Sequence, residues 1–266
     1  LSLYVHLPFC ASLCYYCACN KVITQSDEKK RRYLDALIKE IRLKSKDFDA
    51  ARPVYQMHWG GGTPTYYSDA ELTELWFEIG RHFHLVEPER GEYSIEIDPR
   101  TIDGNKLGLL KGLGFNRISL GIQDFDQRVQ EAINRVQSYE QIRDLLQAAR
   151  NYQYRSVNFD LIYGLPYQTV ASVRETITKV IDLSPDRISL FNYAHLPQRF
   201  KSQSLLPEEA LPPAEEKLQI LCDASNQLMN AGYVYIGMDH FAKPTDELAL
   251  AQAEGSLHRN FQGYTT

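Results

Sequence analysis

The sequence predicts an α/β fold in which parallel strands alternate with helices. The first observation is the alternation itself, because short strand-like runs and longer amphipathic runs follow one another along the chain. The second is that six such βα units succeed each other in 266 residues, without a linker between them. Right-handed crossovers between parallel strands then favour a partial or full (β/α)6, TIM-like barrel. We expect residues 1–266 to form one domain.

Each strand is predicted by a short apolar or alternating run, and each helix by apolar residues at helical spacing. The first run, LSLYVHL, is typical of a buried strand. The predicted strands are residues 1–7, 54–60, 92–98, 117–123, 156–163 and 187–193, with a seventh at 233–238. The predicted helices are residues 27–48, 68–83, 105–113, 139–152, 171–183 and 214–230.

Polar residues gather where the predicted strands end. In barrels of this kind, the chemistry also takes place at the carboxyl ends of the strands. Strand-end glycines, acids and amides therefore indicate an active site rather than a plain core. They are Gly60, Gly61, Gly62, Glu96, Asp98, Gln123, Asp124, Asn158, Asp160 and Asn192.

Composition excludes several classes of protein. The formal net charge of −5 argues against a general nucleic-acid surface. No apolar run reaches the roughly 18 residues of a membrane span. The five cysteines are odd in number and spread over a long chain, which favours a reducing compartment over a disulfide framework. We therefore expect a cytoplasmic protein with no membrane span and no nucleic-acid partner.

Four cysteines lie close together in the string HLPFCASLCYYCACN, and the first three have the spacing C-x3-C-x2-C. Soft thiolates suit an iron–sulfur cluster, and three of them leave one iron of a 4Fe-4S cube open. A structural zinc site usually needs a second pair of ligands farther along the chain. None follows here, although a zinc-stabilised binding module stays open as an alternative. Cys222 lies alone in an apolar helical run, and we expect it in the core.

The C-x3-C-x2-C spacing matches the signature of the radical S-adenosylmethionine (SAM) superfamily. Further segments spread over the whole chain are similar to one family within it, the oxygen-independent coproporphyrinogen III oxidases. The segments are LSLYVHLPFCASLCYYCACNK, HWGGGTPTY, SIEIDPR, GFNRISLGIQDF, FDLIYGLPYQT, FNYAHLP, GMDHFAKP and HRNFQGYTT. The resemblance implies the radical SAM type of partial barrel. It also implies a fragment, because the family has an N-terminal extension and a helical C-terminal domain that are absent here.

The resemblance further implies an activity. Members of the family use a reduced 4Fe-4S cluster to cleave SAM, and the resulting 5′-deoxyadenosyl radical starts the oxidative decarboxylation of two propionate side chains of coproporphyrinogen III. The product is protoporphyrinogen IX, with two vinyl groups. An external one-electron donor is required, and we expect a monomer. A related radical SAM haem chaperone or an anaerobic haem-degrading enzyme is the alternative within the superfamily.

The cysteines take separate roles by this resemblance. Cys10, Cys14 and Cys17 match the three cluster ligands. Cys19 matches an extra cysteine of the oxidases, where haem chaperones usually have Phe. Because a fourth thiolate would close the open iron, Cys19 is expected to take part in catalysis without ligating iron.

A first SAM molecule is expected beside the glycine run and on strand 92–98. Alternation places Glu96 opposite Ile95 and Ile97, so its carboxylate needs a partner. That partner is an internal arginine or, by resemblance, SAM, in which case Glu96 is also a catalytic residue. By the same resemblance, further contacts come from Tyr4, Tyr16, Gly61, Gly62 and Thr63. Without it, Tyr4 would be a core aromatic and the glycines a tight turn.

The resemblance also implies a second SAM molecule, so the expected cofactors are a 4Fe-4S cluster and two SAM. The matching positions are Gln123, Arg135, Asp160 and Ala194. From chemistry alone, Arg135 would be a solvated residue at a helix end, and Ala194 would carry no signal. The substrate has four carboxylates, so basic residues near strand ends are candidates to bind it: Arg135, Arg199, Lys201 and Arg259.

Overall fold

A computed structural model describes residues 1–260 and 263–265. Its internal contacts divide the chain into two compact units. The first unit contains Leu1–Ser12, Cys19–Ile118 and Ala148–Arg155, and the second contains Leu13–Ala18, Ser119–Gln147 and the chain from Ser156 onward. The chain therefore passes from one unit to the other inside the cysteine segment.

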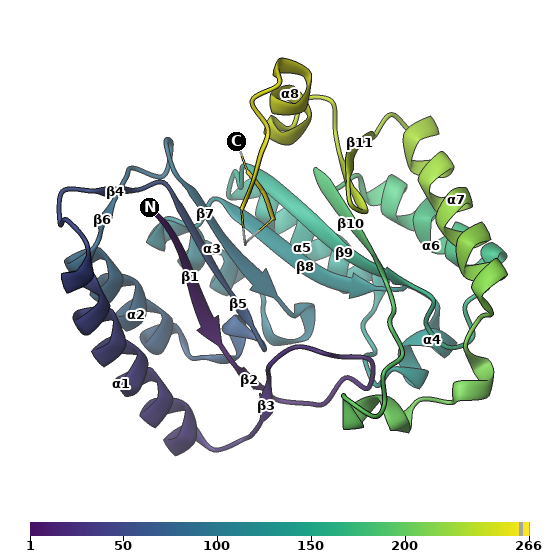
Figure 1. Cartoon of the computed structure of the whole chain (residues 1–266), viewed down its shortest axis with the longest axis horizontal. Coiled ribbons are helices and arrows are strands. Elements are labelled where there is room, and N and C mark those ends of the chain that lie inside the picture. The colour runs from purple at the N-terminus through teal and green to yellow at the C-terminus, as the bar shows by residue number, and fades with distance from the viewer. Residues whose placement is uncertain (261–262, 266) are drawn as a thin grey trace. The chain divides into compact units, whose positions relative to one another are not determined.

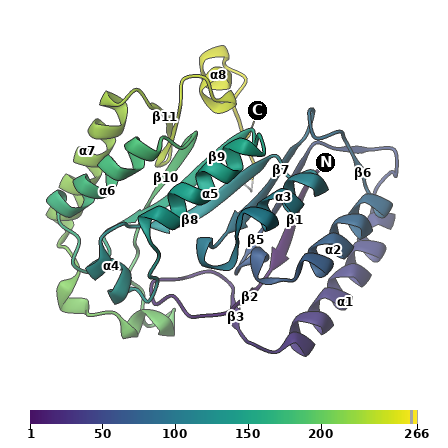
Figure 2. The same ribbon diagram turned by 180° about the vertical axis from the view of Figure 1, so that it is seen from behind.

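The first unit is built on three parallel strands in the order β1-β5-β7 (Figure 1). They are β1 (Ser2–Leu7), β5 (Gln56–Gly61) and β7 (Glu92–Ile97). Three helices lie on one face of these strands, as Figure 2 shows from behind. They are α1 (Asp27–Lys44), α2 (Asp69–His82) and α3 (Gly104–Leu113). Helix α2 begins with a complete capping box, in which Ser68 and Glu71 satisfy each other's backbone N–H groups.

The two faces of these strands differ in chemistry. On the helix side, Trp59 packs edge-on against Phe115 with 5.0 Å between ring centroids, and Trp76 lies 4.8 Å from Phe115 and 5.8 Å from Tyr93. The other face carries polar side chains at alternating positions, and period two explains the separation. The prediction that Glu96 lies opposite the apolar residues of its strand is confirmed, because Ile95 and its apolar neighbours are buried.

Short elements complete the first unit. Two parallel pairs flank the main strands: β2 (Phe9–Cys10) with β3 (Val22–Ile23), and β4 (Pro53–Val54) with β6 (His84–Leu85). Single turns of 3-10 helix follow at η1 (Ser45–Asp47), η2 (Pro64–Tyr66) and η3 (Pro99–Thr101).

The second unit has the strand order β8-β9-β10-β12-β11. Strands β9 (Ser156–Tyr163) and β10 (Arg187–Asn192) are parallel. Strand β12 (His240–Ala242) runs antiparallel to both β10 and β11 (Val234–Gly237). Strand β8 (Arg117–Gln123) starts in the first unit and continues in the second.

The helices of the second unit follow its strands along the chain. They are α4 (Gln127–Ala132), α5 (Tyr139–Asn151), α6 (Val170–Leu183), α7 (Ala214–Asn230) and α8 (Glu247–Glu254). The last residues of α5 belong to the first unit. The remaining elements are η4 (Lys201–Leu205), η5 (Glu208–Ala210) and the antiparallel pair β13 (His258–Asn260) and β14 (Gly263–Thr265).

The main strands and helices agree closely with the prediction, and the differences are local. The strand predicted at 233–238 is present as β11 but antiparallel to its neighbour, so it is not a further parallel βα unit. Helices α4 and α8 were not predicted, because six and eight residues are too few for a clear periodic pattern. The core position predicted for Cys222 is wrong, since its side chain is exposed on α7. Among the described residues, no helix is long and apolar enough to cross a membrane.

Candidate active site

The four clustered cysteines fall in both units. Cys10 ends β2 and Cys19 is exposed, both in the first unit, whereas Cys14 and Cys17 lie in the second. Each of the five cysteines is a thiol rather than half of a disulfide, as a soft metal site requires. Within residues 1–260 and 263–265, no group of three or more His, Cys, Asp or Glu side chains is gathered as a metal site. The assignment of cluster ligands therefore rests on the chemistry of the thiols and on their spacing in the sequence.

Cys10 is held at the edge of the glycine loop. The Thr63 hydroxyl donates to Cys10 Sγ at 3.3 Å. A side chain at Gly62 would place its Cβ 2.4 Å from the Pro8 carbonyl oxygen and 3.0 Å from Cys10 Sγ. The glycine thus keeps space beside the thiol, and this local arrangement fits a sulfur that ligates a cluster.

The N–H groups of Gly61, Gly62 and Thr63 are used inside the protein. Gly61, at φ +118°, donates to the Glu96 carboxylate at 3.0 Å, and Gly62 donates to the Leu7 carbonyl at 2.9 Å. The Thr63 N–H donates to the Phe9 carbonyl at 3.0 Å. These three N–H groups are therefore not available to a ligand.

Glu96 lies on the polar face of the first unit with a half-exposed side chain. One carboxylate oxygen accepts from Gly61 N–H and the other contacts His58 Nε2 at 3.2 Å. No described contact pairs Glu96 with an arginine, so the internal arginine partner weighed from the sequence is not found. Asp98 lies one residue beyond β7, where it caps η3 and pairs with Arg100 at 2.7 Å. These described contacts of Asp98 are local.

Tyr4 is not a core aromatic, because 43% of it is exposed. Its ring stacks on His58 with 5.9 Å between centroids, and its hydroxyl is 3.1 Å from His6 Nδ1. Burial of the hydroxyl, and then the nearby Glu96 and Cys19, raise the pKa of Tyr4 to about 12. The first unit thus brings Tyr4 and Glu96 into one polar group.

His6 and His58 were missed by the sequence reasoning. His58 alternates with the buried Met57 and Trp59 on β5, and this alternation is the signal that could have found it. His6 Nε2 lies 2.9 Å from the Asn20 carbonyl oxygen, which ties the strand to the segment just after Cys19.

In the second unit, η4 holds the backbone around Cys17. The Gln203 side chain donates to the carbonyl oxygens of Tyr16 at 3.0 Å and Ala194 at 3.2 Å. The Ser202 hydroxyl donates to the Cys17 carbonyl oxygen at 3.4 Å. Two of the predicted site residues, Tyr16 and Ala194, are therefore linked by a buried amide that the sequence did not reveal.

Arg135 lies beside Cys14 rather than at a solvated helix end. Its guanidinium donates to Cys14 Sγ at 3.7 Å and to the Gly121 carbonyl at 2.8 Å, and only 7% of the residue is exposed. A Cβ at Gly121 would lie 2.9 Å from Arg135 Nη2 and 3.1 Å from Gln123 Nε2. The side chains of Gln123 and Arg135 therefore share the space over this glycine.

Asp160 is held in the middle of β9. Its carboxylate accepts from the Ser119 hydroxyl at 2.5 Å and from the Asn158 amide at 2.8 Å. Asn158 also donates to Ser119 and to Ser189, so Asp160 belongs to a polar cluster that joins neighbouring strands. The structure links Gln123 with Arg135 and Tyr16 with Ala194, whereas Asp160 makes its described contacts with other residues.

Asp124 was counted among the strand-end acids, and that interpretation is corrected. Its side chain is fully buried and accepts from Thr176, Gln168 and the Asp126 N–H at 2.5, 2.5 and 2.8 Å. Burial raises the pKa of Asp124 above its ordinary value. Asp124 is part of the packing that holds the strand ends.

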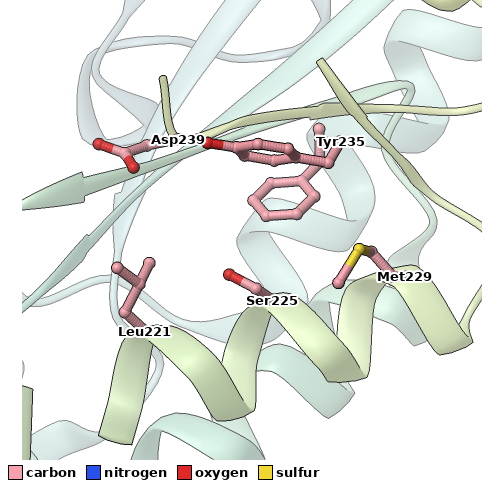
Figure 3. A pocket seen from close by; sticks show the side chains of 6 residues that line it. Leu221, Ser225, Met229, Tyr235 and Asp239 are labelled. Carbon is pink, nitrogen blue, oxygen red and sulfur yellow. The ribbon is translucent and has the colours of Figure 1, made fainter. Parts of the chain in front are cut away.

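A cavity of about 200 Å³ lies in the second unit away from these residues (Figure 3). Its walls come from α7 on one side and from the β11–β12 hairpin on the other. The lining residues are Leu221, Ser225, Met229, Tyr235, Asp239 and Phe241. None of the predicted site residues is among them.

The chain is similar over its whole length to curated proteins. The chain is 54% identical over its whole length to the oxygen-independent coproporphyrinogen III oxidase of Pseudomonas aeruginosa and 51% identical to that of Escherichia coli. The chain spans 58% of the length of these two curated relatives. It is thus similar to a large part, but not the whole, of each.

Solved structures give the same fold. The structure described as coproporphyrinogen III oxidase (HemN) from Escherichia coli, a radical SAM enzyme, superposes with a TM-score of 0.96 at 50% identity, covering 100% of this chain and 60% of that one. The radical SAM methyltransferase TsrM of Kitasatospora setae matches at 14% identity with a TM-score of 0.54, covering 73% of this chain and 37% of that one, which shows the fold alone.

The predicted fold class, an α/β partial barrel of the radical SAM type, is confirmed by these matches. Such a fold implies a 4Fe-4S cluster and SAM as cofactors, and the free Cys10 thiol beside Gly62 and Thr63 fits them. The model of the Radical SAM superfamily matches residues 4–180, more than half of the sequence. The chain therefore belongs to the radical SAM superfamily.

Proposed function

We propose that the protein converts coproporphyrinogen III to protoporphyrinogen IX without oxygen, by oxidative decarboxylation of two propionate side chains to vinyl groups. The observation that carries the proposal is identity of 54% to an oxygen-independent coproporphyrinogen III oxidase across all 266 residues. The chain spans 58% of that relative, so residues 1–266 are proposed as its radical SAM catalytic domain. An external one-electron donor, a monomeric state and a cytoplasmic location belong to the same proposal.

Cys10, Cys14 and Cys17 are proposed to ligate the cluster. The Thr63 hydroxyl and the Arg135 guanidinium each donate to one of these sulfurs, which supports thiolates at both positions. When bound, the cluster supplies the electron that cleaves SAM and starts the reaction. The chain's own part is to hold the reactants in register and exclude water from them.

Tyr4, Tyr16, Gly61, Gly62, Thr63 and Glu96 are proposed to bind the first SAM. Glu96 offers a half-exposed carboxylate with two of its lone pairs already fixed. A carboxylate accepts hydrogen bonds, as an amino group or ribose hydroxyls require. The buried backbone of Tyr16 is held by Gln203, which supports a fixed aromatic position beside Cys17.

Gln123, Arg135, Asp160 and Ala194 are proposed to bind a second SAM. The shared space of Gln123 and Arg135 over Gly121, next to Cys14, supports their acting together. Asp160 carries a carboxylate on the strand that neighbours β8. Equilibrium binding of SAM to the reconstituted protein measures how many SAM molecules bind per chain. A ratio of one SAM per chain would contradict the second site.

Cys19 is proposed as a catalytic residue that does not ligate iron. Its exposed side chain and its influence on the Tyr4 hydroxyl support a thiol that faces the polar group of the first unit. For the substrate carboxylates, Arg199, Lys201 and Arg259 are the better candidates, because they are exposed whereas Arg135 is buried.

Anaerobic incubation of the full-length protein with SAM, a reductant and coproporphyrinogen III tests the proposal. We expect 5′-deoxyadenosine and vinyl product to form together, as mass spectrometry measures. SAM cleavage without vinyl product would favour a haem chaperone or a haem-degrading enzyme. A colourless protein that contains zinc and no iron would overturn the radical chemistry altogether.

A further inference from the structure

The polar face of the first unit is organised in rows across its three strands. The register pairs Tyr4 with His58 and His58 with Ser94, so the three side chains lie side by side on β1, β5 and β7. His58 occupies the middle of the row. The next position on the same face of β5 is Gly60, where a Cβ would fall 2.7 Å from Glu96 Oε1. The Glu96 carboxylate therefore lies over the glycine and reaches the His58 ring.

The contacts of His58 define its hydrogens. Its Nε2 is 3.2 Å from Glu96 Oε1, and its Nδ1 is 2.6 Å from Ser94 Oγ. A carboxylate oxygen only accepts, so Nε2 carries the hydrogen and donates it to Glu96. The Ser94 hydroxyl can then donate to Nδ1 and keep the imidazole in this tautomer.

His58 also supports Tyr4, another side chain proposed to bind SAM. The Tyr4 ring stacks on it at 16° between planes, and 5.9 Å separates the ring centroids. One imidazole therefore touches both Tyr4 and Glu96. The other donor to Glu96, the Gly61 N–H, comes from the glycine loop itself.

We propose that His58, locked by Ser94, is a positioning residue that orients the Glu96 carboxylate for SAM. The inference rests on the proposed SAM site and names the residues that make it work. Because His58 and Gly61 each hold one oxygen, the carboxylate presents its remaining lone pairs in a fixed direction. Loss of the His58 bond leaves an exposed, mobile carboxylate and weakens SAM binding.

The test is equilibrium binding of SAM to the anaerobically reconstituted protein without reductant. His58→Phe keeps a ring to stack on Tyr4 but removes both hydrogen bonds, and should weaken SAM affinity about tenfold. His58→Gln keeps an amide donor toward Glu96 and should recover most of the affinity. Ser94→Ala should weaken binding about twofold. His84→Phe, at an exposed histidine of the same unit, is the matched control and should change nothing.

A double-mutant cycle separates this inference from the proposed function. Glu96→Gln should weaken SAM binding at least tenfold, and adding His58→Phe should then cost less than about twofold more. If Glu96→Gln weakens binding but His58→Phe does not, or if the two effects multiply in full, only the role of His58 is overturned. If Glu96→Gln leaves the affinity unchanged, the SAM site at Glu96 fails as well.

A purely structural role would give another pattern. His58→Phe and His58→Gln would then lower the thermal unfolding midpoint alike, with SAM affinity unchanged, and this result also overturns the inference. Iron content and the charge-transfer absorption of each variant verify that the cluster is intact.

Discussion

Two acids at the ends of neighbouring predicted strands, Glu96 in the first unit and Asp124 in the second, have opposite environments. The Glu96 side chain is 43% exposed and has one hydrogen-bond donor on each oxygen. Asp124 is 0% exposed and is enclosed by three donors. The Glu96 carboxylate can still accept hydrogen bonds from a ligand, whereas the Asp124 oxygens already accept hydrogen bonds from the protein.

The comparison separates binding from stability. A buried carboxyl that is fully hydrogen-bonded holds loops together, and removing it leaves several donors unsatisfied. Removing a half-exposed carboxyl changes the stability of the folded chain little, but it weakens the binding of a ligand that contacts the carboxyl. Both residues are acids near the end of a strand, and it is mainly their surroundings that distinguish them.

The largest expected effect is on stability at Asp124. Asp124→Ala should lower the free energy of unfolding by about 3 kcal/mol, because the Thr176, Gln168 and Asp126 donors lose their buried acceptor. Urea denaturation measures the change. Glu96→Ala is the matched variant and should cost less than about 0.5 kcal/mol. Equal losses of unfolding free energy in Asp124→Ala and Glu96→Ala would show that the two acids contribute equally to stability.

The glycine loop gives the next largest effect. Gly62→Ala should destabilise the protein by about 2 kcal/mol and reduce bound iron, because the new Cβ meets the backbone of Pro8 at 2.4 Å and presses on Cys10. Iron per chain after anaerobic reconstitution is the measurement.

Gly112→Ala is the control for this variant. Nothing lies within 4 Å of a Cβ at Gly112, which is in α3, so the change should raise stability by about 0.5–1 kcal/mol. A Gly62→Ala protein that binds normal iron would show that Cys10 does not depend on this space.

The pH dependence of stability should distinguish Asp124 from an exposed acid. Burial raises the pKa of Asp124 in the folded chain above the ordinary 3.8. The folded state then keeps its proton while the unfolded state loses it, so stability falls as pH rises from about 4 to the raised pKa. The slope is at most about 1.4 kcal/mol per pH unit.

Comparison with Asp124→Asn isolates the contribution of Asp124 to the pH dependence of stability, because other titrating groups are common to both proteins. Wild type should lose stability relative to Asp124→Asn over that range, and the difference should level off above it. A difference that is constant, or that grows in favour of wild type as pH rises, would show that Asp124 is ionised in the folded protein.

The smallest effect is expected at Gln203. Gln203→Ala removes the donor to the Tyr16 and Ala194 carbonyls and should cost about 1 kcal/mol, with faster loss of iron to a chelator. Gln252→Ala is the control, since Gln252 also donates to two carbonyls but is exposed. Identical iron-loss rates in the two variants would show that the cysteine segment does not need this anchor.

Most of the elements could be predicted from the sequence, because periodicity reports which face of a strand or helix is buried. The alternation of β7 placed Glu96 on the polar face before any contact was known. Short elements such as α4 could not be predicted, since one or two turns carry no period. Cys222 shows the opposite failure, because an apolar neighbourhood in sequence did not make it buried.

Local patterns were enough to predict the alternation of strands and helices, the soft donor set of Cys10, Cys14 and Cys17, and the glycine loop. Which side chains meet became visible only in the folded chain. His58 and Glu96 are 38 residues apart and Arg135 and Cys14 are 121 apart. Such pairs depend on strand register and loop packing, which local patterns do not encode. For the same reason, Glu96 and Asp124 are both strand-end acids in the sequence, yet one is half-exposed and the other buried in the fold.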